Sequence, residues 1–409
     1  MYDVILVRFG EMTLKKKNYN TFLKQINNNI KQKLKNFPNL EIKDARHRIY
    51  LFLNGHKHEE VIEVLNTIVG LSSYSLCKIT SKDFDEISQT AIQLINYAKK
   101  KERITFKVET NRSDKSFPYN SLEISQEVAK RILPKIPGLM VNVHHPEMTL
   151  FIDFRTEGVF VYLDSIPGLG GFPGGMAGSG LVMMSGGIDS PVSAFLSIKK
   201  GVNIQAIHFY SPPHTSILSL QKVIDLCERL CEYMPNGKMN LMVVPFTKIQ
   251  EKIYQSVDDS YIITIMRRIM YKIAHQVCQK YNIDCIINGE SIGQVASQTI
   301  ESMKVVNEVT NIPILRPLLT YDKTEIIEIA RKIKTYDISI RPFDDCCTIF
   351  VPKHPVIKPT IKKAIYEEEK CNLQQEIEQA IKNIEIIELS SNNHYSVLEI
   401  DTNQDKFEI

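Results

Sequence analysis

The stretch that decides the fold is Leu181–Lys200, which reads LVMMSGGIDSPVSAFLSIKK. Four apolar residues typical of a buried strand precede the string SGGIDS at residues 185–190, and a helical pattern follows from Pro191. Glycines let the backbone turn tightly, so that successive N–H groups point into one concavity, and the helix N-terminus adds its positive end. Residues 185–190, which we call the phosphate loop, are therefore predicted to bind an anion.

Asp189 is an unusual residue in an anion site, because its carboxylate repels phosphate unless it also holds a cation. Mg²⁺ prefers one or two carboxylates together with phosphate oxygens. No lysine follows the glycines, so the loop differs from the Walker pattern. We therefore predict Asp189 as a catalytic residue and as a candidate Mg²⁺ ligand that acts through phosphates. A plain glycine-rich turn is the alternative.

Working outward from this loop, the chain divides into four parts. Downstream, strands alternate with long helices, which predicts a doubly wound α/β domain with a parallel sheet at residues 181–409. Upstream, residues 167–180 carry a glycine-rich run typical of a linker. Residues 1–60 and 61–166 each mix strands with helices. They are predicted to form two small α+β units.

Composition excludes several other classes of protein. Hydrophobic residues make up 43% of the chain and charged residues 24%, unlike a disordered or collagen-like protein. No run approaches the ~18 apolar residues of a membrane span, and the N-terminus lacks the pattern of a signal peptide. Eight scattered cysteines are too few for a disulfide scaffold. We expect a cytoplasmic protein that does not contact membranes.

Charge is spread unevenly along the chain. Residues 1–60 hold 12 lysines and arginines against 6 acidic residues, whereas residues 367–409 hold 3 against 11. The basic amino end is compatible with a phosphate-rich partner such as nucleic acid, and a solvated lysine face explains it equally well.

The phosphate loop resembles the PP-loop of the ATP pyrophosphatases, which adenylate a substrate and release pyrophosphate. Further motifs follow in order: HFYSPP at 208–213, RR at 267–268, NGES at 288–291, GQVASQT at 293–299 and RPL at 316–318. Together they resemble the tRNA 4-thiouridine synthase (ThiI) family over essentially the whole chain. The family consists of sulfurtransferases that are also linked to thiamine biosynthesis. Residues 1–60 resemble its ferredoxin-like domain, and residues 61–166 its RNA-binding THUMP domain.

This resemblance implies ATP and Mg²⁺ as cofactors. Apolar and aromatic side chains beside the loop suit a purine. The nucleotide-contacting positions carried over from the family are Met183, Met184, Ser185, Gly186, Gly187, Asp189, Ser190, His208, Phe209, Arg267, Gly289 and Gln298. Taken singly, the two methionines also fit the core of a strand, Arg267 a surface charge on a helix, and Gln298 a loop hydrogen bond.

Two adjacent cysteines, Cys346 and Cys347, lie in the stretch FDDCCTIFVPKHP. Family members carry an essential cysteine here, so the resemblance implies that one of the two carries a persulfide and is catalytic. The sequence leaves open which one, and a buried structural pair is the alternative. Cys227 and Cys231 lie four residues apart on a predicted helix and are interpreted as core residues rather than metal ligands.

The resemblance also implies partners. Some members continue into a rhodanese domain with a second cysteine, whereas this chain ends in an acidic tail and resembles the short form. The expected partners are therefore tRNA, a separate cysteine desulfurase as persulfide donor, and a sulfur-carrier protein if the thiamine role operates. A homodimer is left open. The expected RNA-binding residues are Arg112, Lys115 and Lys107.

The predicted reaction is ATP-dependent sulfur transfer to a tRNA uridine, which is uridine 8 in the family, giving 4-thiouridine. The uracil oxygen is adenylated, and a persulfide sulfur then displaces AMP. The alternatives are a PP-loop thiolase of another tRNA base and a sulfur-relay protein acting on a carrier protein. A cluster-dependent thiolase is disfavoured because the chain has no C-x-x-C pair.

Overall fold

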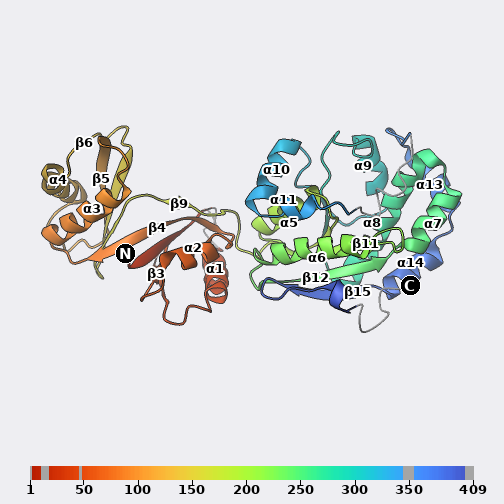
Figure 1. Cartoon of the computed structure of the whole chain (residues 1–409), viewed down its shortest axis with the longest axis horizontal. Coiled ribbons are helices and arrows are strands. Elements are labelled where there is room, and N and C mark those ends of the chain that lie inside the picture. Colours follow the sequence, from red (N-terminus) through yellow and green to blue (C-terminus); the bar gives the residue numbers. More distant parts are fainter. Residues whose placement is uncertain (1, 11–17, 46–47, 344–353, 401–409) are drawn as a thin grey trace. The chain divides into compact units, whose positions relative to one another are not determined.

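The computed structural model describes residues 2–10, 18–45, 48–343 and 354–400. The chain divides into two compact units, Met1–Gly171 and Phe172–Ile409, each with a sheet of its own (Figure 1). Within the described ranges, no helix is both long and apolar enough to cross a membrane.

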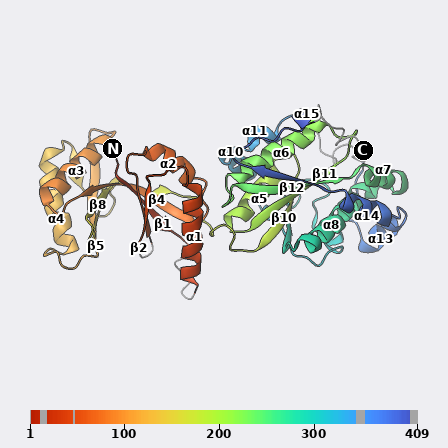
Figure 2. The ribbon, with the colours of Figure 1, turned by 90° about the horizontal axis from the view of Figure 1, so that it is seen from below.

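The first unit is built on a nine-stranded sheet in the order β2-β3-β1-β4-β8-β7-β5-β6, with β9 paired to β4. Its strands are β1 (Val4–Phe9), β2 (Glu41–Ala45), β3 (Arg48–Phe52), β4 (Leu71–Thr80), β5 (Ile104–Arg112), β6 (Leu139–Val141), β7 (Met148–Phe154), β8 (Val159–Tyr162) and β9 (Ile166–Pro167). Its α-helices are α1 (Tyr19–Lys33), α2 (His58–Leu65), α3 (Phe84–Ala98) and α4 (Ser121–Ile132). Helices α3 and α4 pack on β8 and β5, respectively (Figure 2).

Strand β4 joins the two halves of this sheet. Its residues Leu71–Cys77 pair with β1, and Lys78–Thr80 pair with β8. The pattern LSSYSLCKIT does not alternate strictly between apolar and polar residues, so sequence analysis does not find this strand. The boundary expected between residues 60 and 61 falls within α2, whose Val61 and Leu65 are buried.

The second unit holds a six-stranded sheet in the order β14-β13-β10-β11-β12-β15. Its strands are β10 (Ser179–Met183), β11 (Asn203–Tyr210), β12 (Lys238–Pro245), β13 (Cys285–Ile287), β14 (Ile314–Leu315) and β15 (Glu385–Ser390). The first five strands in this order are parallel, which confirms the predicted doubly wound sheet, and β15 is an antiparallel edge strand. The α-helices are α5 (Asp189–Lys199), α6 (Ile217–Cys231), α7 (Thr247–Ser256), α8 (Ile262–Tyr281), α9 (Ile300–Asn307), α10 (Lys323–Lys332), α11 (Tyr336–Ser339), α13 (Ile361–Glu369), α14 (Gln374–Lys382) and α15 (Val397–Ile400).

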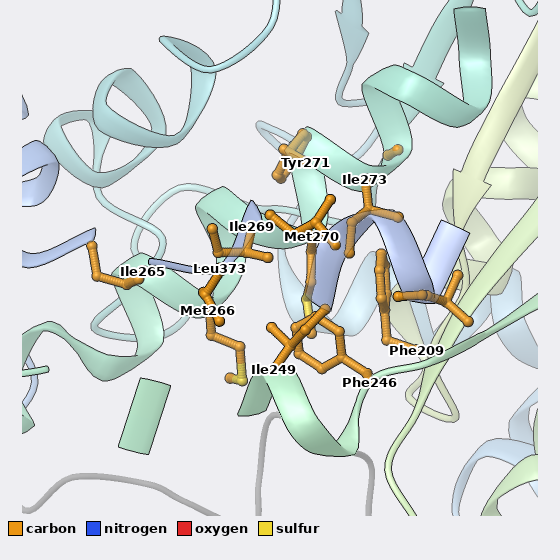
Figure 3. Packing of buried hydrophobic residues seen from close by; sticks show 14 of the residues in the cluster. Phe209, Phe246, Ile249, Ile265, Met266, Ile269, Met270, Tyr271, Ile273 and Leu373 are labelled. Atoms are coloured by element: carbon orange, nitrogen blue, oxygen red, sulfur yellow. The ribbon is translucent and has the colours of Figure 1, made fainter. Parts of the chain in front are cut away.

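The core of the second unit lies between the sheet and α8, which is buried along most of its length. Apolar side chains from α7, α8 and α14 pack on those of β11 and β12. Figure 3 shows part of this cluster, including Phe209 of β11, Met270 of α8, and Phe246 and Leu373 just before α7 and α14. Phe209 and Met270 also line a pocket at the edge of this core. The packing that stabilises the fold therefore also forms one wall of that pocket.

The winding of the sheet defines where a ligand binds. Strand β10 lies between β11 and β13, so the chain winds outward in opposite directions on its two sides. In open parallel sheets, ligands bind at the carboxyl ends of the strands where this direction reverses. The phosphate loop follows β10, and residues 288–291 follow β13, so both segments meet at this point.

Candidate active site

The phosphate loop is closed on itself by its first and last serines. The backbone N–H of Ser185 donates to the hydroxyl of Ser190 at 3.0 Å, and this hydroxyl donates to the Ser185 carbonyl, also at 3.0 Å. The N–H of Gly187 points to the Ser185 hydroxyl at 3.4 Å. Helix α5 begins directly at Asp189, so its N-terminal end faces the loop. The helix end supplies the partial positive charge that an anion site uses.

Position 289, in the segment that follows β13, requires a glycine. A Cβ built on Gly289 would lie 2.8 Å from the carbonyl carbon of Asp189 and 2.8 Å from the nitrogen of Ser190. Both are backbone atoms, which have little freedom to move away. Gly289 thus allows the segment after β13 to pack directly against the end of the phosphate loop.

The carboxylate of Asp189 has two partners that sequence reasoning missed. Lys323, the first residue of α10, donates from Nζ to Oδ1 at 2.6 Å, and Gln294 donates from Nε2 to Oδ2 at 2.9 Å. Both partners come from segments more than a hundred residues away along the chain. Gln294 lies within the quoted motif at 293–299, but no local pattern signals Lys323. Lys323 brings a positive charge to the phosphate loop that the Walker pattern would supply from within the loop.

Beside the phosphate loop lies a pocket of about 510 Å³. Seven of the predicted nucleotide-contacting residues line it: Met183, Met184, Ser185, His208, Phe209, Arg267 and Gln298. The remaining wall comes from Ile263, Met270, Tyr271, Asn288, Glu290, Val295, Ala296, Ser297 and Pro355. Apolar and aromatic side chains dominate this wall, which is typical of a site for a flat heterocycle.

Hydrogen bonds hold the two sides of this pocket in place. The buried ring of His208 bonds through Nδ1 to the Met184 carbonyl at 3.0 Å, and the Met184 N–H donates to the Ile207 carbonyl at 2.8 Å. On the opposite side, the Ser291 N–H donates to Oε1 of Gln298 at 3.3 Å. Both sides of the pocket are thus fixed by bonds within the protein itself.

Arg267 lies in the pocket wall rather than on an exposed helix surface. Its side chain is 14% exposed and forms an ion pair with Glu290. It also donates to the Ser297 carbonyl at 2.5 Å. Glu290 was not singled out as a site residue by the sequence, although it lies in the quoted motif at 288–291.

The other predicted residues of the loop do not line the pocket. Gly186, Gly187, Asp189 and Ser190 lie in the adjoining phosphate loop, and Gly289 packs against its end. The pocket and the phosphate loop are therefore two adjacent parts that meet at Ser185.

The two cysteines predicted to carry sulfur, Cys346 and Cys347, lie outside the described residues. The segment just before them is held by the buried Lys222 of α6, whose Nζ donates to the carbonyls of Arg341 at 3.2 Å and Phe343 at 2.6 Å. The hydroxyl of Ser339 donates to the carbonyl of Gly187 at 3.2 Å. The chain that leads to the cysteines thus contacts the phosphate loop.

The six described cysteines are all buried. Cys227 and Cys231 are fully buried in the core, as predicted, and burial raises the pKa of Cys227. Burial also raises the pKa of Cys278 to about 12 and that of Cys285 to about 11. These thiols are protonated at neutral pH and are poor nucleophiles.

The three predicted RNA-binding residues lie on or next to β5 in the first unit. Arg112 donates to the carbonyls of Phe117 at 2.7 Å and Tyr119 at 3.1 Å, so it also holds the loop that follows β5. Lys107 pairs with Glu109 at 2.8 Å, and Lys115 is exposed.

The doubly wound sheet, the phosphate loop after β10 and the apolar pocket beside it define a nucleotide-binding α/β domain. A model of the thiamine biosynthesis protein ThiI matches residues 175–373. Models of the ThiI ferredoxin-like domain and of the THUMP domain match residues 4–75 and 81–164, respectively.

Similar proteins cover nearly the full length. A probable tRNA sulfurtransferase of Acholeplasma laidlawii is 48% identical, over 97% of this chain and 96% of that protein. A probable tRNA sulfurtransferase of Geobacillus sp. (strain WCH70) is 46% identical, over 94% of this chain and 95% of that protein. The chain belongs to the ThiI family of tRNA sulfurtransferases.

Two solved structures agree with this assignment. A 4-thiouridine synthetase in complex with RNA and bound ATP matches with a TM-score of 0.86 and 31% identity, over 95% of this chain and 100% of that one. PH1313 from Pyrococcus horikoshii matches with a TM-score of 0.62 and 22% identity, over 81% of this chain and 99% of that one, which shows a shared fold.

Proposed function

We propose that this chain uses ATP to replace the 4-oxygen of a tRNA uridine with sulfur, giving 4-thiouridine. The observation that carries the proposal is the pocket of about 510 Å³ that adjoins the phosphate loop at the reversal point of the sheet. The similarity to a 4-thiouridine synthetase with bound RNA and ATP supports it, as do the tRNA sulfurtransferases at 46–48% identity.

In this proposal the adenine lies between the Met183–Met184 side and the His208–Phe209 side of the pocket. The phosphates extend over residues 185–190, where backbone N–H groups and the N-terminus of α5 stabilise negative charge. Arg267 contacts the nucleotide from the pocket wall. Apolar walls exclude water around the base, while a few polar groups fix its orientation.

Two groups at the phosphate loop balance the charge of the triphosphate. Lys323 supplies a cation, and Asp189 would hold Mg²⁺. A carboxylate has about four lone-pair sites, so Asp189 keeps acceptor capacity beyond its bonds to Lys323 and Gln294. When bound, the metal neutralises charge on the phosphate oxygens.

The proposed reaction has two steps, in which pyrophosphate and then AMP are the leaving groups. The uracil 4-oxygen attacks the α-phosphate, and pyrophosphate leaves from the phosphate loop. The adenylated oxygen becomes a good leaving group, so a persulfide sulfur on Cys346 or Cys347 attacks the ring carbon and AMP departs. A second thiol then attacks the sulfur of that cysteine, so the sulfur–sulfur bond breaks and the thiolated base is released. The disulfide formed between the two thiols is reduced by an external thiol before the next turnover. A separate cysteine desulfurase is the proposed source of the persulfide.

Pyrophosphate release in the presence of unmodified tRNA tests the adenylation step. We expect release that depends on both ATP-Mg²⁺ and tRNA, and its loss in Asp189→Asn. The matched control is Asp284→Asn, because Asp284 is also a hydrogen-bonded carboxylate, which accepts from the Ser179 N–H at 2.7 Å, but it lies at the amino end of the sheet. Release that does not depend on tRNA, or that persists in Asp189→Asn, would contradict the proposal.

A further inference from the structure

A buried carboxylate, Glu290, lies between two arginines at the wall of the nucleotide pocket. Its side chain is 8% exposed. One carboxylate oxygen pairs with the Arg267 guanidinium, and the other accepts from Nε of Arg316 at 2.6 Å. Arg267 and Arg316 come from helix α8 and from the segment after β14, so Glu290 links two separate elements.

Glu290 is itself held in place by its surroundings. Nδ2 of Asn288 donates to the same carboxylate oxygen as Arg316, at 2.7 Å, and also bonds to the Tyr271 hydroxyl. The backbone N–H of Glu290 donates to Oδ1 of Asn288 at 3.2 Å. Because Oε2 accepts from Arg316 and Asn288 while Oε1 faces Arg267 in an ion pair without accepting a hydrogen bond, Glu290 contributes a fixed negative charge rather than an adaptable ligand.

Glu290 balances the charge of the two arginines and fixes the orientation of their side chains. Without Glu290, two guanidinium cations would lie close together in a largely buried site, and each would lose its counter-charge. Arg267 donates from Nη1 to the Ser297 carbonyl, and its Nη2 faces the Glu290 carboxylate, so Glu290 adds a charged partner on a second nitrogen of the guanidinium. The planar guanidinium is best held when two of its edges are bonded.

We propose that Glu290 is a positioning residue for nucleotide binding: it holds the Arg267 guanidinium against the pocket wall in the orientation that the nucleotide requires. This inference rests on the proposed function of the pocket as an ATP site. Glu290 itself lines the pocket wall, and we assign its effect to the Arg267 orientation that it fixes.

Removing the negative charge of Glu290 has two effects on the affinity for ATP, and these effects have opposite signs. Glu290→Gln makes the pocket more positive, and by simple attraction this strengthens the binding of an anionic nucleotide. Loss of the fixed Arg267 orientation weakens binding. If Glu290 positions Arg267, the second effect dominates, and the sign of the change in affinity distinguishes the two.

The test is ATP binding by the full chain, measured by equilibrium dialysis without RNA. We expect Glu290→Gln and Arg267→Ala each to weaken binding about tenfold or more, as for one partner removed from a buried charge pair. The double variant should bind no more weakly than Arg267→Ala alone, because Glu290 acts through that arginine. Glu290→Asp, which keeps the charge, should bind more tightly than Glu290→Gln and covers the case in which Glu290→Gln does not fold.

The matched control is Glu368→Gln. Glu368 pairs with Arg268, the neighbour of Arg267 on α8, at 2.7 Å, but neither residue lines the pocket. This control should leave ATP affinity unchanged. Unchanged or tighter binding by Glu290→Gln, or additive losses in the double variant, would overturn the inference while leaving the ATP site intact. Absence of ATP binding by the unaltered chain would instead refute the proposed function.

Discussion

Gly289→Ala tests whether the segment after β13 supports the phosphate loop. The added methyl carbon would lie 2.8 Å from two backbone atoms of Asp189 and Ser190, where 3.4 Å or more is ordinary contact. The two segments must therefore separate by several tenths of an ångström. Overpacking of this kind costs about 2 kcal/mol, which corresponds to a fall of about 6 °C in the unfolding midpoint for a domain of this size.

The displacement acts on the groups proposed to bind phosphate. Ser190 bonds to Ser185 across the loop, so a shift of Ser190 distorts the whole anion site. We expect the affinity for ATP to fall about tenfold or more, equivalent to about 1.4 kcal/mol. Thermal unfolding without nucleotide and equilibrium dialysis with ATP measure the two effects separately.

Gly187→Ala is the matched control for the stability effect. Its added methyl carbon would meet only the Ser185 hydroxyl, at 3.6 Å, so the unfolding midpoint should not change. A Gly289→Ala protein with an unchanged midpoint and unchanged ATP affinity would refute the argument that Gly289 allows close packing against the loop.

Three further predictions follow from the site. Lys323→Met should lower tRNA-dependent pyrophosphate release about tenfold or more with little change in stability, since its ion pair is partly exposed; normal release would contradict a role in charge balance. Iodoacetamide at pH 8 should leave the six described cysteines unmodified in the native protein, because they are buried, and peptide mass mapping that finds one of these thiols labelled would contradict this expectation. Lys222→Met should release the segment that ends at Phe343 and reduce sulfur transfer more than pyrophosphate release, whereas equal losses in the two assays would argue against a specific effect on sulfur delivery.

The phosphate loop and its flanking elements were predictable because the signal is local. The predicted strand at 181–184 and helix at 191–200 correspond to β10 and α5, within one to two residues at most ends. The strand, the glycine turn and the helix N-terminus are encoded in adjacent residues. The loop can therefore be predicted without knowledge of contacts between distant parts of the chain.

The partners of the loop were not predictable in the same way. Lys323 and Gln294 reach Asp189 from across the domain, and Glu290 meets Arg267 only because α8 packs beside the end of β13. Charged side chains on a helix have the same sequence signature whether they face solvent or a pocket. Only the tertiary packing distinguishes them.

Strand β4 was missed for a related reason. It lies in the middle of the nine-stranded sheet, and both Tyr74 and Cys77 are buried in it. What packs on each face of the sheet decides which side chains of a strand are buried, so the pattern of a central strand can depart from simple alternation.

The most direct test of the account is nucleoside mass spectrometry of unmodified tRNA incubated with the protein, ATP-Mg²⁺, cysteine and a cysteine desulfurase. We predict that one uridine gains sulfur in place of oxygen, that the gain requires ATP, and that it is lost in Cys346→Ser or Cys347→Ser. Pyrophosphate release without any thiolated nucleoside, or sulfur incorporation without ATP, would contradict the central claim.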